Sequence, residues 1–387
     1  MRLLVLLLLV STATAGPDAL ALLKQADERI HAFDLPGAEQ AITDALRASP
    51  RIKDAYLARA YLRLKLTPPN AAGAARDFER CARLGGDTWR AAAMLYGKLS
   101  EYDRQAQAYE QAWKAGEDLD DLHGVAAARA NAGELEAALF AYDELIRRGE
   151  PKPSIDYLGE RAEIRAMLGS SEAGLRDIER GLALNAGWFR GHQIRGRIQM
   201  RMGRPKDALA SYKKALEMEP RIASSYFILG LAHYDLGNWN DAVWGFQRTL
   251  SFGDGTGGGH PYATLYMFLA RCRTGVAARR VEAYRELMKQ VSERKRGTDD
   301  WIGKLAGHLA GIVGAEELLE EARKGNRFLR RERLCEAHAY IGARLLISEE
   351  PEAARGHFEK AVATGVYTFM EYKTSWCELQ RMPKRLK

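Results

Sequence analysis

Small, branched and aromatic residues recur in the middle of the chain with a period of 34 residues. Four columns share this period: one of glycines, two of small residues and one of aromatic or branched residues. Their members are Gly169, Gly203 and Gly237; Gly174, Ala208 and Ala242; Ile178, Tyr212 and Phe246; and Gly181, Ala215 and Thr249. This period is typical of a repeated pair of α-helices. The pattern therefore predicts an all-α fold of stacked helical hairpins.

Each column has a physical reason within such a hairpin. Glycine ends the first helix, because a left-handed turn residue without a Cβ is unstrained. The first small column lets the two helices approach closely, and the bulky residue four positions later fills the space between repeats. Pro220 then ends its second helix, because proline cannot continue the hydrogen-bond ladder. The pattern therefore predicts that each repeat consists of two helices joined by a tight turn, and that the second helix ends before the next repeat begins.

The columns extend in both directions with insertions, which gives about seven repeats over residues 16–252. The earlier members are Ala38, Ile42 and Ala45; Ala74, Phe78 and Cys81; Gln105, Tyr109 and Ala112; and Ala138, Tyr142 and Leu145. Residues 253–261 are rich in glycine and are predicted to connect the array to a helical region at 262–387. That region holds degenerate repeats, a last good repeat at Ala354, Phe358 and Ala361, and a terminal helix from Val366 to Arg381. A terminal helix is expected to cover the last apolar face of a solenoid.

The first 15 residues have the pattern of a cleavable signal peptide. Arg2 precedes an apolar run from Leu3 to Val10, and Ala13 and Ala15 form a small-residue cleavage site. Eight apolar residues are too few for a membrane-spanning helix, which needs about 20. We therefore expect an exported protein, periplasmic or secreted, without a lipid-bearing cysteine or a membrane span.

The sequence contains no recognisable catalytic, cofactor-binding or metal-binding motif. The four cysteines are far apart, and the eight histidines form no zinc-binding spacing. We expect Cys81 to be a buried free thiol, whereas a disulfide among the other three stays open. No Gly-Lys-Ser/Thr follows the glycines of 253–259, so a phosphate-binding loop is disfavoured. The formal charge of +7 comes from dispersed basic residues, which argues against nucleic acid as a partner.

Residues of the first helix of each repeat are expected to line a concave groove. In the tetratricopeptide repeats that this 34-residue pattern resembles, positions 2, 5, 9, 12 and 13 face the groove. This resemblance implies the candidate binding residues Arg190, Gln193, Arg197, Arg201, Phe227, Tyr234, His123 and Asn131. Arginines bind carboxylates through two parallel hydrogen bonds, and aromatic rings provide desolvated contact area. This combination predicts an extended peptide with acidic groups as the partner. The alternative is that the arginines are only solvated or pair with neighbours such as Glu163.

The 34-residue pattern resembles the tetratricopeptide-repeat (TPR) superfamily, which implies a right-handed superhelix. The C-terminal third is similar to NlpI-type envelope TPR proteins in the segments 333–342, 353–361, 363–366, 369–372 and 378–379. That resemblance implies a non-enzymatic scaffold that recruits cell-wall hydrolases or a protease, and it allows a homodimer. The chain departs from that group in lacking a lipidated cysteine and in having more repeats.

The sequence thus predicts a non-enzymatic periplasmic adaptor that binds other envelope proteins or peptides. Two alternatives stay open: an envelope enzyme or glycan-processing subunit built on the solenoid, and a structural component of an envelope assembly or secretion machine.

Overall fold

The computed structural model describes residues 16–252, 262–293, 300–366 and 369–383. The predicted signal peptide at 1–15 and the glycine-rich connector at 253–261 lie outside the described residues. Within the described ranges the chain forms 21 helices and no strand. The prediction of an all-α fold is therefore confirmed.

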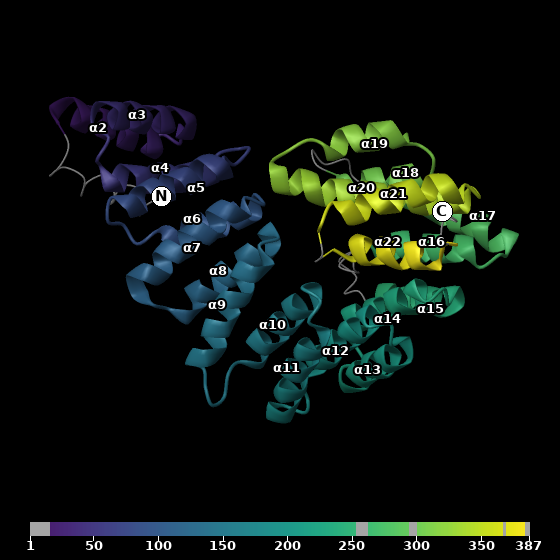
Figure 1. Cartoon of the computed structure of the whole chain (residues 1–387). Helices are drawn as coiled ribbons and strands as arrows, with labels where there is room; N and C mark the ends of the chain where they lie inside the picture. The colour runs from purple at the N-terminus through teal and green to yellow at the C-terminus, as the bar shows by residue number, and fades with distance from the viewer. Residues whose placement is uncertain (1–15, 253–261, 294–299, 367–368, 384–387) are drawn as a thin grey trace. The chain divides into compact units, whose positions relative to one another are not determined.

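The helices follow one another with short connections (Figure 1). Their bounds are α2 Pro17–His31, α3 Leu35–Ala48, α4 Lys53–Lys65, α5 Ala71–Arg83, α6 Trp89–Lys98, α7 Tyr102–Gly116, α8 Leu119–Ala132, α9 Leu135–Arg148, α10 Ile155–Met167, α11 Ser171–Leu184, α12 Phe189–Arg201, α13 Pro205–Met218, α14 Ala223–Asp235, α15 Trp239–Ser251, α16 Ala263–Arg273, α17 Ala277–Glu293, α18 Trp301–Leu309, α19 Ala315–Ala322, α20 Arg327–Ile347, α21 Pro351–Ala363 and α22 Met370–Arg381. None of these helices is long and apolar enough to cross a membrane.

The chain divides into two compact units, Met1–Ala141 and Tyr142–Lys387. The division falls inside α9, whereas the sequence suggested a boundary at the glycine-rich connector. In the first unit, successive helices pack in pairs, α2 with α3, α4 with α5 and α6 with α7. Its cores are rich in alanine, as at Ala38, Ala45 and Ala74, so the helices lie close together.

The second unit contains the repeats with the clearest 34-residue period. Here α10 packs with α11, α12 with α13 and α14 with α15. The turn residues Gly203 and Gly237 have φ angles of 70° and 78°, the left-handed region that glycine adopts without strain. A Cβ on Gly174 would lie 2.6 Å from the carbonyl oxygen of Ala162, so α10 and α11 are in close contact at this position. The physical reasons assigned to the columns are thus visible in the hairpins.

The helices after α15 share one hydrophobic core with the last repeats. Phe227, Phe246, Tyr266, Tyr340 and Phe358 are all buried in this core. Helix α22 packs against α20 and α21 and also contacts α14, so that it lies between the C-terminal hairpin and the last repeats (Figure 1). The predicted terminal helix therefore exists, and it contacts helices of the preceding repeats in addition to the last hairpin.

Candidate functional site

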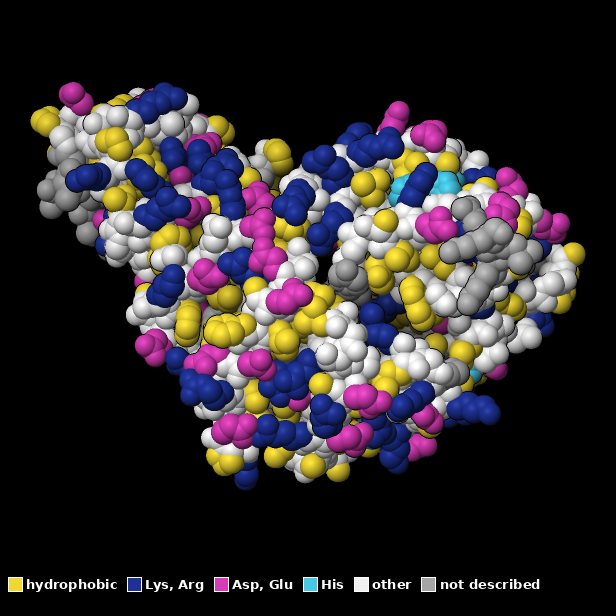
Figure 2. Space-filling view, viewed as in Figure 1, with side chains coloured by type: hydrophobic (Ala, Val, Ile, Leu, Met, Phe, Trp, Pro, Cys, Tyr) yellow, Lys and Arg dark blue, Asp and Glu magenta, His cyan; other side chains and the backbone are white. Residues whose placement is uncertain are grey.

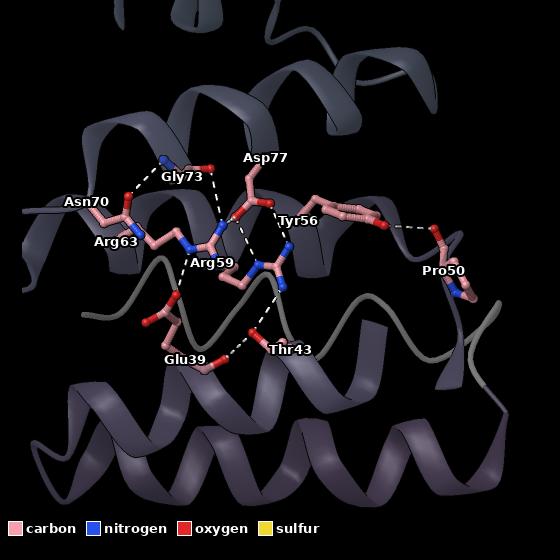
Figure 3. Close-up of polar contacts among 9 residues, drawn as sticks. All are labelled: Glu39, Thr43, Pro50, Tyr56, Arg59, Arg63, Asn70, Gly73 and Asp77. Carbon is pink, nitrogen blue, oxygen red and sulfur yellow. Dashed lines mark hydrogen bonds and ion pairs between the residues drawn. The ribbon is translucent and has the colours of Figure 1, made fainter. Parts of the chain in front are cut away.

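Pairs of arginines one helical turn apart stabilise the contacts between neighbouring hairpins. In the first unit, Arg59 and Arg63 of α4 both bind the buried carboxylate of Asp77 on α5, at 2.7 and 2.9 Å (Figure 3). Arg59 also donates to Thr43, and Arg63 forms an ion pair with Glu39 on α3. These arginines join three successive helices, and the contacts occupy their guanidinium groups.

The same arrangement occurs in the second unit. Arg161 and Arg165 of α10 bind Asp177 of α11 at 2.6 and 2.9 Å, and Arg161 reaches Asp143 on the preceding helix. One period later the polar equivalents are Arg195, Gln199 and Ser211, which are joined by hydrogen bonds. On the face shown in Figure 2, basic and acidic side chains are likewise interspersed. Many arginines of this chain are thus structural.

Two predicted groove residues, Arg197 and Arg201, line a cavity in the second unit. They are repeat positions 9 and 13 of α12, as the repeat pattern predicts. Arg197 forms an ion pair with Glu163 of α10, with Nε and Oε1 2.7 Å apart. This contact is the neutralising pair that the alternative interpretation named. Arg201 has no hydrogen bond or ion pair with any residue that the structure describes.

The other predicted residues of this unit are placed differently. Phe227 and Tyr234 are buried, with 2% and 1% of their surface exposed, because rings of α15 and α16 pack on them. Their expected role as ligand-contacting rings is therefore corrected: both belong to the core. Gln193 is buried and donates to Ser225 Oγ at 3.1 Å. Arg190 is half exposed and lies 3.8 Å from carboxylates of Asp156 and Glu160.

His123 and Asn131 lie on α8, in the first unit. His123 is partly buried and Asn131 is exposed. They are not part of the cavity around Arg197 and Arg201, and their role in binding stays a prediction.

The cavity has a volume of about 310 Å³ and lies between α22 and the helices α10, α12 and α14. Most of its lining is apolar, whereas five charged side chains reach it. It is lined by Glu163, Ala166, Met167, Arg197, Ile198, Met200, Arg201, Tyr212, Ile228, Leu231, Ala232, Asp235, Met370, Tyr372, Lys373, Thr374, Trp376 and Cys377. The inner surface of these repeats is thus covered by a helix of the same chain.

The charges in the cavity act strongly on one another because they are removed from water. Burial and repulsion by Arg197 lower the pKa of Lys373 to about 8. Burial raises the pKa of Asp235 to about 7, although Arg381 attracts its carboxylate. Burial also favours the neutral form of Glu163, but the charges of Arg197 and Lys373 outweigh burial and hold its pKa below the usual value. The cavity therefore carries an excess of positive charge at neutral pH.

Polar contacts at its C-terminal end hold α22 in place. Arg381 Nη1 donates to the carbonyl oxygen of Tyr234 at 2.8 Å. Glu378 is buried and pairs with Arg273 of α16 and with Arg381. Both guanidinium groups also lie over the ring of Trp239, at 4.1 and 5.2 Å from its centre. These contacts fix one wall of the cavity.

Other candidate chemistry is limited in the described part of the chain. No group of three or more potential metal ligands occurs there. All four cysteines are free, and burial raises the thiol pKa values of Cys81, Cys272 and Cys335. Cys81 is buried, as predicted. The Nδ1 atoms of His338 and His357 lie 3.0 Å apart, which is a hydrogen-bond distance between a neutral pair.

Sequence reasoning missed the half of the cavity that α22 provides. Lys373 and Trp376 lie outside the 34-residue pattern, so no repeat position assigned them to an inner surface. Asp235 is position 13 of its repeat, so the rule that selects Arg201 also places Asp235 on the inner surface. Glu163 was recognised only as a neighbour of Arg197.

A known family model matches part of the repeat array. Residues 195–250 match the model described as tetratricopeptide repeat. These residues cover α12 to α15, the hairpins that carry the clearest period. No curated protein matches the sequence.

Solved structures that partly match the chain include repeat proteins of low sequence identity. A tetratricopeptide repeat protein from Parabacteroides merdae ATCC 43184 is 16% identical, with a TM-score of 0.45, over 66% of this chain and 99% of that one. A thermophilic TPR protein from Thermus thermophilus is 18% identical, with a TM-score of 0.41, over 46% and 97%. MamA is 18% identical, with a TM-score of 0.34, over 43% and 90%.

The similarity to NlpI-type proteins stays a prediction. The 34-residue period, the hairpins that it forms and the model matched at residues 195–250 agree that this part of the chain consists of tetratricopeptide repeats.

Proposed function

We propose that this protein is a non-enzymatic scaffold of the cell envelope that binds segments of other envelope proteins. The observation that carries the proposal is the contact between α22 and α14, beside a cavity that α12 also lines. There a helix is bound by apolar side chains together with backbone and charged contacts. Polypeptide segments are bound by helical grooves through the same kinds of contact.

The expected partners carry acidic segments, because unpaired or weakly paired arginines occur at the edge and floor of this surface. Arg190 is 48% exposed, and its nearest carboxylates are 3.8 Å away. Arg201 has no partner among the described residues. A carboxylate-rich segment can form charge-assisted hydrogen bonds with both. Cell-wall hydrolases or a processing protease are the partner classes that the resemblance of the C-terminal third implies.

The test is capture of partners from an envelope extract by the tagged full chain, followed by identification by mass spectrometry. The variant Arg190→Glu/Arg201→Glu is expected to lose most of the captured protein, because like charges then face the acidic segment. Arg197 is left unchanged, since reversing it would bring two carboxylates together at Glu163 and disturb the fold.

The matched control is Arg176→Glu/Arg204→Glu, which makes the same change in charge at exposed positions. It is expected to capture partners as the parent chain does. Equal loss in both variants would indicate a non-specific charge effect, and equal capture in all three would move the binding surface elsewhere. Circular dichroism checks that each variant is folded.

A further inference from the structure

The cavity beneath α22 has the dimensions of a small-molecule site. Ligand pockets commonly have volumes of about 300 to 1,000 Å³, and this cavity has about 310 Å³. That is roughly twice the volume of an engineered apolar cavity of about 150 Å³ that holds benzene. Its walls come from five helices, so it is formed by tertiary structure and not by one flexible side chain.

One part of the lining is apolar. Met167, Ile228, Leu231, Met370 and Trp376 contribute hydrocarbon, sulfur and ring surface from α10, α14 and α22. A ligand with an apolar body gains free energy when this surface is removed from water. A small inorganic ion would leave most of the lining without contact.

The polar part of the lining is not satisfied within the chain. The carboxylate of Glu163 pairs with Arg197. The side chains of Arg201 and Lys373 form no ion pair or hydrogen bond with a described residue. Asp235 Oδ1 is also buried without a hydrogen-bond partner in the described part of the chain. Buried polar groups in folded proteins are nearly always paired, so Asp235 Oδ1 indicates a missing partner. Arg201 and Lys373 are partly buried, and their side chains stay available to a ligand that enters the cavity.

The charged side chains of the cavity determine which sign of charge a ligand should carry. Arg197, Arg201 and Lys373 contribute three cationic groups, and burial together with repulsion by the two arginines lowers the pKa of Lys373. Glu163 provides one full negative charge, whereas the carboxyl of Asp235 is only partly ionised at neutral pH. An anion relieves this imbalance, and a cation increases it.

We propose that this cavity binds a small amphipathic anion, with its acidic head at Arg201 and Lys373 and its apolar body against Leu231, Met370 and Trp376. The protonated form of Asp235 can donate a further hydrogen bond to the head group. This site shares Arg201 with the surface proposed for acidic protein segments, whereas Leu231, Lys373 and Trp376 belong to the cavity alone.

Isothermal titration calorimetry with three eight-carbon probes tests the proposal: octanoate, octan-1-ol and octylammonium. They share one apolar chain and differ in the charge of the head. Octanoate is expected to bind the full chain at least tenfold more tightly than octan-1-ol, and octylammonium is expected to bind weakest. Equal binding of octanoate and octan-1-ol, or no binding of either, would overturn the proposal.

Three variants locate the site. Arg201→Gln and Lys373→Gln are each expected to weaken octanoate about tenfold, which corresponds to the loss of one charge-assisted contact, and to leave octan-1-ol unchanged. Arg204→Gln is the matched control, because Arg204 is exposed and pairs with Glu172. Leu231→Trp fills the cavity and is expected to abolish binding of both probes.

The outcomes separate this proposal from the scaffold function. Octanoate affinity that is equal in the parent chain, Arg201→Gln and Lys373→Gln would place the anion elsewhere and contradict the assignment. Partner capture by a Leu231→Trp chain that no longer binds octanoate would leave the scaffold function intact. Circular dichroism and the thermal unfolding midpoint of each variant confirm that a loss of binding is not a loss of fold.

Discussion

At the scale of single residues, the buried aspartates of the second helices hold neighbouring hairpins together. Asp77 and Asp177 each receive two guanidinium groups, and their side chains are only 3% and 6% exposed. A carboxylate in this position neutralises charges that are otherwise difficult to bury. Each aspartate and its two arginines therefore depend on one another for their burial.

Asp177→Asn is expected to lower the free energy of unfolding by about 3 kcal/mol, because the partly buried Arg161 and Arg165 then lack a full counter-charge at this position. Urea unfolding followed by circular dichroism measures the change. Glu172→Gln is the control: Glu172 and its partner Arg204 are 63% and 49% exposed, and the expected change is below about 1 kcal/mol. Equal effects in the two variants would show that burial does not determine the strength of these pairs.

Glu371 provides a second prediction at this scale. It is buried and faces Glu336, Tyr340 and Tyr266, and burial together with the charge of Glu336 raises its pKa to about 8. The unfolded chain ionises this group near its ordinary pKa of 4.5. Between these two values the folded state retains a proton that the unfolded state loses, so stability falls as pH rises from about 4.5 to 8 and changes no further above 8.

The thermal unfolding midpoint at pH 5, 7 and 9 measures this dependence. Glu371→Gln is expected to reduce the decrease between pH 5 and pH 9, because the neutral amide does not titrate. Glu359→Gln, at an exposed position of α21, is expected to behave as the parent chain. A Glu371→Gln profile parallel to that of the parent would exclude Glu371 as the source.

At the scale of helices, glycine determines how closely the members of a hairpin pack. A Cβ on Gly174 would lie 2.6 Å from Ala162 O and 3.3 Å from Ile198 Cδ1, whereas nothing lies within 4 Å of a Cβ on Gly356. Gly174→Ala is therefore expected to destabilise the chain by about 1 to 3 kcal/mol, since α10 and α11 must separate. Gly356→Ala is expected to stabilise it by about 0.5 to 1 kcal/mol through helix propensity. Chemical denaturation of the two variants compares them, and a shift of both in one direction would contradict this interpretation.

The sequence predicted the hairpins well because each depends on residues close to one another in the chain. Gly203 and Gly237 turn where the period places them, and Arg197 and Arg201 face the inside as their repeat positions indicate. The closure by α22 was not predictable from the period. Its contact with Tyr234 joins residues 147 positions apart and depends on the summed rotation of many hairpins. The burial of Phe227 and Tyr234 was not predictable from the period either. Tyr266 of α16 packs on the face of α14 that carries both rings.

At the scale of the whole molecule, stability is expected to be local. Each hairpin of a solenoid contacts mainly its neighbours, so a defect spreads over a short distance. Asp77→Asn is expected to reduce the hydrogen-exchange protection of amides in α4 and α5 and to leave α20 and α21 unchanged. Exchange followed by mass spectrometry measures both regions. A uniform loss of protection would show that the chain unfolds as one cooperative unit.

Helix α22 is the last helix to be synthesised, so it packs after the repeats that it contacts have folded. The hairpins are built from contacts between adjacent segments, and such local contacts form quickly. The ion pair of Glu378 with Arg273 joins residues 105 positions apart, and the ribosome delivers α22 after every helix that it touches. The repeats α10 to α14 therefore complete their hairpins while their inner surface is still uncovered. Until α22 packs, Arg201 and Leu231 lie on an open surface, and they become cavity lining only when this last helix arrives.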